Sequence, residues 1–160
     1  MNARGASPEH RAALLEAARL VARQDARENE AVVLRMLRDP RSGIAEAMVA
    51  ALLEARREAA IPLILRCLGE HRAEGQRLLD GLLESELDGL DVRGKIVSVL
   101  IDSDDRYEIL GALSAIGWLA PSGGFPGSPA ALARVHDLSE SPDEPVRILA
   151  QAAVTAFGAH

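Results

Sequence analysis

Four acidic residues recur along this chain at junctions between short apolar segments. They are Asp39, Glu70, Asp102 and Asp143. The intervals are 31, 32 and 41 residues, and the last contains a Gly- and Pro-rich insertion at 121–129, without which it would be 32. A period of this length made of two helices is typical of stacked helical repeats, the α-solenoids. The spacing therefore predicts an all-helical chain whose units lie side by side.

The composition also favours helices. Apolar residues make up 48% of the chain, chiefly as Ala and Leu, whereas aromatic residues make up only 2%. Ala and Leu have high helix propensity, while strands prefer β-branched and aromatic residues. Apolar periodicity and breakers predict helices at about 8–24, 28–38, 43–56, 61–68, 73–87, 92–101, 104–119, 129–138 and 143–157. We expect four helix pairs and an unpaired C-terminal helix in one domain over residues 1–160.

Two segments carry a known helical pattern. Residues 143–158 are similar to the first helix of a HEAT repeat, and residues 102–117 match them at an offset of 41. The matching pairs are Asp102 with Asp143, Arg106 with Arg147, Ala112 with Ala153, and Gly117 with Gly158. Residues 59–64 resemble the second helix of the same family, which often begins with an apolar residue and Pro. The resemblance implies that Asp102, Arg106, Asp143 and Arg147 link one repeat to the next.

The resemblance also implies an α-α superhelix that binds proteins along a concave face made by the second helices. Polar residues on those helices would then face a partner. They are Arg35, Arg38, Arg66, Arg93, Lys95, Arg134 and His136. They would line a basic groove inside an acidic protein, or they would be a scatter of solvated side chains.

The insertion at 121–129 interrupts the predicted array. Insertions in solenoids often lie on a binding face. The loop contains Phe125 and follows closely after Trp118, and an exposed aromatic side chain can anchor a partner. The alternative is a plain connector whose Phe125 folds back onto the core.

Net charge bears on the partner and the compartment. The chain carries −6 overall, with an excess of acidic residues in the second half. Nucleic-acid binding needs clustered cations, so we expect a protein partner and no nucleic acid. No apolar stretch is long enough for a membrane span, and no signal core precedes the first helix, so we expect a cytoplasmic protein. All but one of the basic residues are Arg, which indicates a GC-rich bacterial source.

Two segments imitate ligand-binding motifs but lack essential residues. Residues 89–96 resemble a phosphate-binding loop, yet Ile96 stands where the motif needs Ser or Thr. The segment that begins at Asp102 resembles a calcium loop without its Gly and its terminal Glu. The histidines lack metal-ligand spacing, and Cys67 lies in an apolar stretch as a small buried hydrophobe. We therefore expect no cofactor, metal or catalytic residue.

Together these patterns predict a non-catalytic protein-binding scaffold or adaptor, of which an inhibitor or immunity-type protein is one form. The alternative is an enzyme or enzyme subunit on a HEAT-like scaffold. A chromophore lyase fits that alternative, and a DNA glycosylase-like protein fits it less well, because the chain is acidic and has few aromatic residues to stack on a base.

Overall fold

The computed structural model describes residues 7–24, 26–41, 43–70, 75–126 and 128–158, and within them it contains helices and turns but no strand. The predicted all-α class is confirmed. The helices are α1 (Pro8–Arg23), α2 (Ala26–Leu37), α3 (Ile44–Arg56), α4 (Ile61–Glu70), α5 (Gly75–Leu87), α6 (Val92–Asp102), α7 (Arg106–Leu119), α8 (Pro129–Leu138) and α9 (Glu144–Gly158), with short 3-10 helices η1 (Arg57–Ala60) and η3 (Ala120–Ser122).

Polar side chains fix several helix starts. Ser7 accepts a hydrogen bond from the backbone N–H of His10 at 3.2 Å and so caps α1. Pro62 lies in the first turn of α4, where a proline does not break the helix. The sequence places the start of α7 at about residue 104, but the capping residue is Asp105, whose carboxylate accepts two backbone N–H groups.

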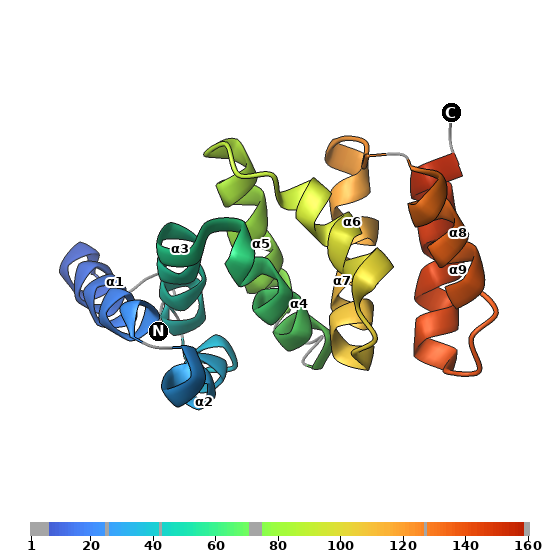
Figure 1. Ribbon diagram of the computed structural model, residues 1–160. Helices are drawn as coiled ribbons and strands as arrows, with labels where there is room; N and C mark the ends of the chain where they lie inside the picture. The colour runs from blue at the N-terminus through green and yellow to red at the C-terminus, as the bar shows by residue number, and fades with distance from the viewer. Residues whose placement is uncertain (1–6, 25, 42, 71–74, 127, 159–160) are drawn as a thin grey trace.

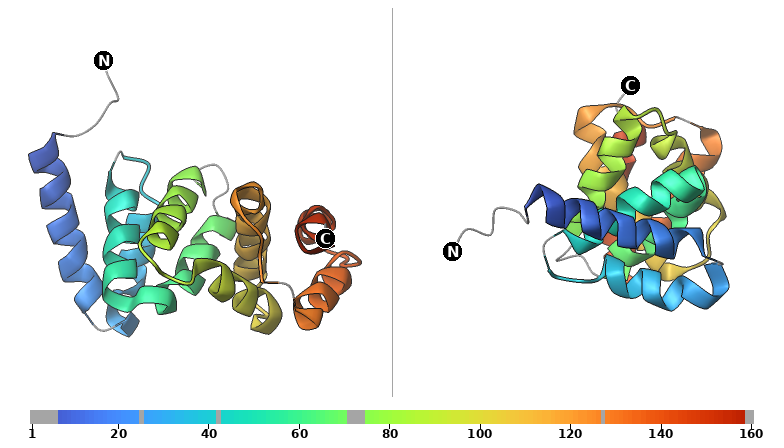
Figure 2. Two further views of the ribbon diagram at one scale, coloured as in Figure 1. Left: turned by 90° about the horizontal axis from the view of Figure 1, so that it is seen from above. Right: turned by 90° about the vertical axis from the view of Figure 1, so that its left-hand side faces the viewer.

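The helices follow one another in a row from α1 to α9 (Figure 1). The first helices of the predicted pairs contact their neighbours along the row, α1 with α3, α3 with α5, and α7 with α9. Seen from above in Figure 2, α6 and α8 lie on one side of that line. A single cluster of buried apolar residues runs through the described part of the chain, from Ala18 in α1 to Ala153 in α9.

The closest contact in the row is between α4 and α7. It depends on two glycines. A Cβ atom on Gly69 would lie 2.0 Å from the carbonyl oxygen of Tyr107, and one on Gly111 would lie 1.8 Å from that of Leu65. Only glycine permits this approach of the two backbones. Because α7 packs against α4, it makes little contact with α5.

Ion pairs join successive junctions. Asp143 accepts a hydrogen bond from Arg106 Nε at 2.5 Å, which links the start of α9 to the start of α7. Earlier in the chain, Arg38 pairs in a similar way with Glu70, which lies at the next junction. Of the four residues predicted to link one repeat to the next, Arg106 and Asp143 therefore join α7 to α9. Arg147 instead donates to the carbonyl of Ser141 within its own junction. Asp102 forms no ion pair with any described residue.

No helix in the described ranges has both the length and the apolar character to cross a bilayer.

Candidate protein-binding groove

A groove of about 590 Å³ opens between α5 and α7. Its lining is mainly apolar and comes from four helices: Leu68, Gly75, Gln76, Leu79, Ser114, Gly117, Trp118 and Leu149. Leu68 of α4 is buried at 2% exposure, so α4 closes the groove from beneath. The groove exists because α7 packs on α4 and leaves its own flank separated from α5.

Trp118 is the largest side chain of the groove. It lies in the last turn of α7 and remains 36% exposed. Gly117 beside it has no atom within 4 Å of the place where a Cβ would stand, so the groove is open at this point. Leu149 of α9 lies at the groove on the far side of α7, and its neighbour Ile148 is 53% exposed. An exposed indole amid apolar side chains suits contact with another macromolecule.

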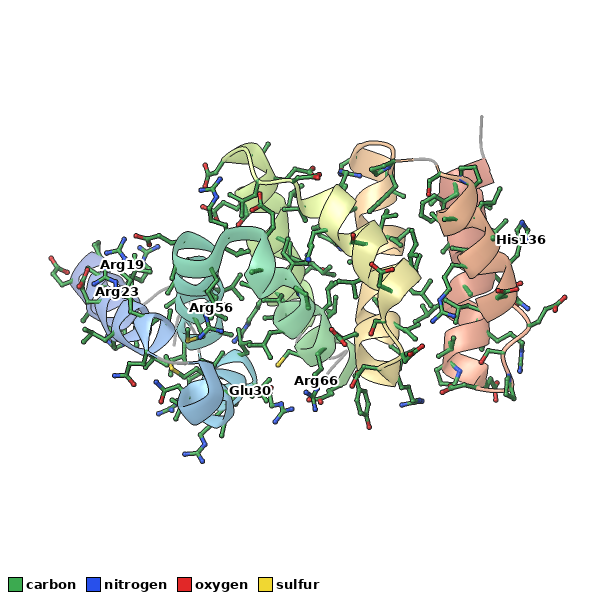
Figure 3. The ribbon with its side chains drawn as sticks, in the orientation of Figure 1. Arg19, Arg23, Glu30, Arg56, Arg66 and His136 are labelled. Atoms are coloured by element: carbon green, nitrogen blue, oxygen red, sulfur yellow. The ribbon has the colours of Figure 1, made fainter. Side chains whose placement is uncertain are left out.

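A second groove, of about 460 Å³, lies on the other flank of α5, between α5 and α3. Its charged lining is mainly acidic: Glu46, Glu54, Asp80, Glu84 and Asp88, with Arg57 and Arg77. Glu54 also lines a third groove between α1 and α3, together with Arg19, Arg23 and Arg56. The three grooves are thus consecutive along the first helices of the pairs. Figure 3 shows the three arginines of the third groove on α1 and at the end of α3.

Phe125 does not present its ring to solvent. It is 8% exposed, and its ring centroid lies 6.1 Å from that of Phe157 in α9. The guanidinium carbon of Arg93 lies 5.0 Å from the Phe125 centroid on another side. The exposed-anchor interpretation of this residue is therefore corrected in favour of the alternative, a ring folded back onto the core. A contact between two aromatic rings stabilises the fold beyond the burial of their apolar surface.

Arg93, on α6, holds the start of the insertion in place. Its guanidinium donates to Glu86 Oε2 at 2.7 Å, to the carbonyl oxygens of Leu119 and Gly123 at 3.1 and 2.5 Å, and to Ser122 Oγ at 2.9 Å. Only 12% of its side chain is exposed. The rigid fork of an arginine suits this arrangement of acceptors. Its donors are engaged inside the molecule, where they hold residues 119–123 onto α6, and its role in partner binding stays a prediction.

The other predicted basic residues lie in separate places: Arg38 and Arg66 both pair with Glu70, whereas Arg134 lies beside α6. Arg134 donates to the carbonyl oxygens of Leu100 and Ser103, both at 3.0 Å, and so satisfies the C-terminal end of α6. Arg66 lies between Glu30 and Glu70, at 3.7 and 3.5 Å. Arg66 and Arg134 therefore already have partners within the chain, and a basic groove along the second helices stays a prediction.

Two further candidates for such a groove are Lys95 and His136. Lys95 is half-buried on α6. His136 is exposed on α8, well separated from Arg66 in Figure 3.

Cys67 is buried, as the sequence predicts. Burial raises the pKa of its thiol to about 11, which disfavours the reactive thiolate. Elsewhere in the described ranges, no three His, Cys, Asp or Glu side chains are placed to hold a metal ion.

The chain matches no family model and no curated protein.

Of the nine predicted site residues, only Trp118 lines the apolar groove. Sequence reasoning missed the part that α5 contributes. The missed signal is a Leu–acid pair that recurs every four residues, at Leu79-Asp80, Leu83-Glu84 and Leu87-Asp88.

Proposed function

We propose that this chain is a non-catalytic protein-binding scaffold and that its partner docks in the groove between α5 and α7. The observation that carries the proposal is the exposed indole of Trp118 in an apolar groove. Tryptophan is among the residues that contribute most to protein interfaces when an apolar pocket surrounds it. A partner that covers the groove removes apolar surface from water, and each square ångström contributes about 25 cal/mol.

We also infer that the row of helices is an α-solenoid of HEAT-like pairs. The support is that polar contacts between distant residues recur at a nearly constant separation: 32 for Arg38–Glu70, 35 for Arg19–Glu54 and 37 for Arg106–Asp143. A constant separation is expected when each unit contacts the next in an equivalent way. The contact of α4 with α7 skips the unit between them and is a departure from a regular stack.

The proposed binding face is formed by first helices of the pairs, not by second helices as the HEAT resemblance implies. Two observations support this choice. The apolar groove has its walls on α5 and α7. On the second helices, Arg93 and Arg134 donate hydrogen bonds to backbone carbonyl oxygens, so they do not offer a free basic surface.

The proposal is tested by comparing how strongly the parent and Trp118→Ala capture the partner from an extract of the native host. Loss of a central tryptophan costs an interface about 2 kcal/mol or more, so we expect at least about tenfold weaker capture. Tyr107→Ala is the matched control, because Tyr107 is also on α7 and 38% exposed but does not line the groove. Equal loss in both variants, or none in Trp118→Ala, would contradict the proposal.

A further inference from the structure

Two parallel stripes with a four-residue period run along α5 and end at Asp88, the residue that follows it. The apolar stripe is Leu79, Leu83 and Leu87, and the acidic stripe is Asp80, Glu84 and Asp88. Residues four apart on a helix lie one above the other, so each set forms a line along the helix axis. The apolar stripe begins in the groove of Trp118, and the acidic stripe lines the groove on the α3 side.

No described cation forms an ion pair with the acidic stripe. Asp80 accepts only the amide of Gln76, at 2.9 Å, and Glu84 and Asp88 form no ion pair with any described residue. Arg77, the nearest cation on the same helix, pairs with Glu46 at 3.3 Å instead. Like charges four residues apart destabilise a helix. Arg57 and Arg77 line the same groove, but they form ion pairs with Glu58 and Glu46. A cation from another molecule would therefore relieve the repulsion that remains along the stripe.

The apolar stripe is also incompletely covered. Leu79 is buried at 6% exposure, Leu83 is partly buried, and Leu87 is 81% exposed. The stripe therefore rises from the floor of the groove to an open end beside the acidic residues. The leucines are only partly covered, and the carboxylates beside them lack ion-pair partners. A segment that covers both rows would need apolar side chains for one and cations for the other.

Resting on the proposed function, we infer that the partner segment is an amphipathic helix with a row of Lys or Arg beside a row of apolar residues. It lies along α5, with its apolar row in the Trp118 groove and its cations over Asp80, Glu84 and Asp88. A helix has the same four-residue spacing as the two stripes, so both rows remain in register over two turns. Opposite charges across the contact orient the segment and speed its association.

Three synthetic peptides without tryptophan test the inference on the full chain. The first is a helix with Leu and Lys in adjacent rows, the second has Glu in place of Lys, and the third has the composition of the first in scrambled order. Trp118 is the only tryptophan, so its emission reports binding at the groove, and calorimetry gives the affinity. We expect the first peptide to bind with an affinity that falls as salt rises, the acidic peptide not to bind, and the scrambled peptide to bind at least about tenfold more weakly.

A charge variant isolates the acidic stripe. Asp80→Asn, Glu84→Gln and Asp88→Asn combined should weaken binding of the basic peptide about tenfold and flatten its salt dependence, since each exposed ion pair contributes only a small part. The matched control is Asp104→Asn, Glu140→Gln and Glu144→Gln, which removes the same charge at exposed positions outside α5. We expect the control to bind the peptide as the parent does.

The outcomes separate the two proposals. Binding that Trp118→Ala abolishes but the charge variant and the acidic peptide do not alter would overturn the basic partner and leave the groove in place. Peptide binding that Trp118→Ala leaves unchanged would overturn the groove itself. A dimer that Trp118→Ala converts to a monomer would make a second copy of the chain the occupant, and would also overturn the basic helix.

Discussion

At the scale of single residues, two glycines decide how closely α4 and α7 approach. The carbonyl oxygens of Tyr107 and Leu65 occupy the space that side chains on Gly69 and Gly111 would need. Backbone atoms cannot turn aside as flexible side chains can. Any larger residue at these positions therefore separates the two helices and opens the centre of the core.

Gly111→Ala should destabilise the fold strongly. We expect a loss of about 3 kcal/mol or more in the free energy of unfolding, because overpacking against backbone shifts a whole helix. Urea denaturation monitored by circular dichroism measures it. The matched control is Gly117→Ala on the same helix, where a Cβ meets nothing within 4 Å. It should raise stability by about 0.5–1 kcal/mol through helix propensity. Equal effects of the two substitutions would disprove the close contact.

Asp143 should make stability depend on pH. Hydrogen bonds from Arg106 lower the pKa of its carboxyl group. Such a group contributes stability above the unfolded pKa, about 4, and the contribution is lost as pH falls through the lower folded pKa. Asp143→Asn should therefore lower the melting temperature at neutral pH, and its difference from the parent should shrink in acid. Asp104→Asn, at an exposed site, is the control. A difference that stays constant down to about pH 2.5 would contradict the assignment.

A second acidic residue adds to the same acid sensitivity. Hydrogen bonds from Arg41 lower the pKa of Asp39 to about 2. Its contribution also disappears as pH falls, and at a lower pH than that of an ordinary aspartate.

Residue roles were only partly predictable from the sequence. The HEAT resemblance implied a linking role for Arg106 and Asp143, which form an ion pair, and for Arg147, which bonds within its own junction instead. It could not show that Arg93 and Arg134 turn inward, since the carbonyl groups that they bind belong to distant segments. The burial of Phe125 likewise depends on Phe157, more than thirty residues away in the chain.

At the scale of elements, Arg93 joins the insertion to α6. Arg93→Lys should destabilise the fold by about 1–3 kcal/mol, because an ammonium group cannot reproduce the forked donors that reach Leu119, Ser122 and Gly123. Limited proteolysis should then cleave near residue 123 before it cleaves the helices. Lys95→Ala, on the same helix, should leave that site protected. Unchanged proteolysis of Arg93→Lys would show that the loop is held by other contacts.

Neutralising the acidic stripe of α5 should stabilise the free protein. Asp80→Asn, Glu84→Gln and Asp88→Asn remove two repulsive pairs four residues apart, each of which costs about 0.2–0.5 kcal/mol. Thermal unfolding at low salt measures the gain, which should shrink as salt screens the charges. A loss of stability would mean that these carboxylates serve the fold rather than a partner.

Helices were more predictable than the surfaces between them. Pro62, Ser7 and the apolar periodicity determine helix positions locally, and their predicted bounds agree with the structure within a few residues. The stripes of α5 were also present in the sequence, as Leu–acid pairs. That Trp118 faces the same helix was not, because it depends on how α7 packs against α4.

At the scale of the whole molecule, the row arrangement predicts uneven protection of backbone amides. The slowest exchange with deuterated water should be in α4 and α7, which share the closest contact, and the fastest in α1 and α9 at the ends of the row. Mass spectrometry of peptic fragments measures this under native conditions. Uniform protection from α1 to α9 would indicate a single cooperative globule instead.

The contact between α4 and α7 also restricts how such a chain can evolve. In a regular array each unit meets identical neighbours, so duplication or loss of one unit leaves the remaining joints intact. Here α4 meets a helix that belongs two units further along, and it does so through glycines matched on both sides. Recombination that inserted a unit between them would bring ordinary side chains against bare backbone. The chain could therefore gain a further helix pair only outside the segment between α4 and α7.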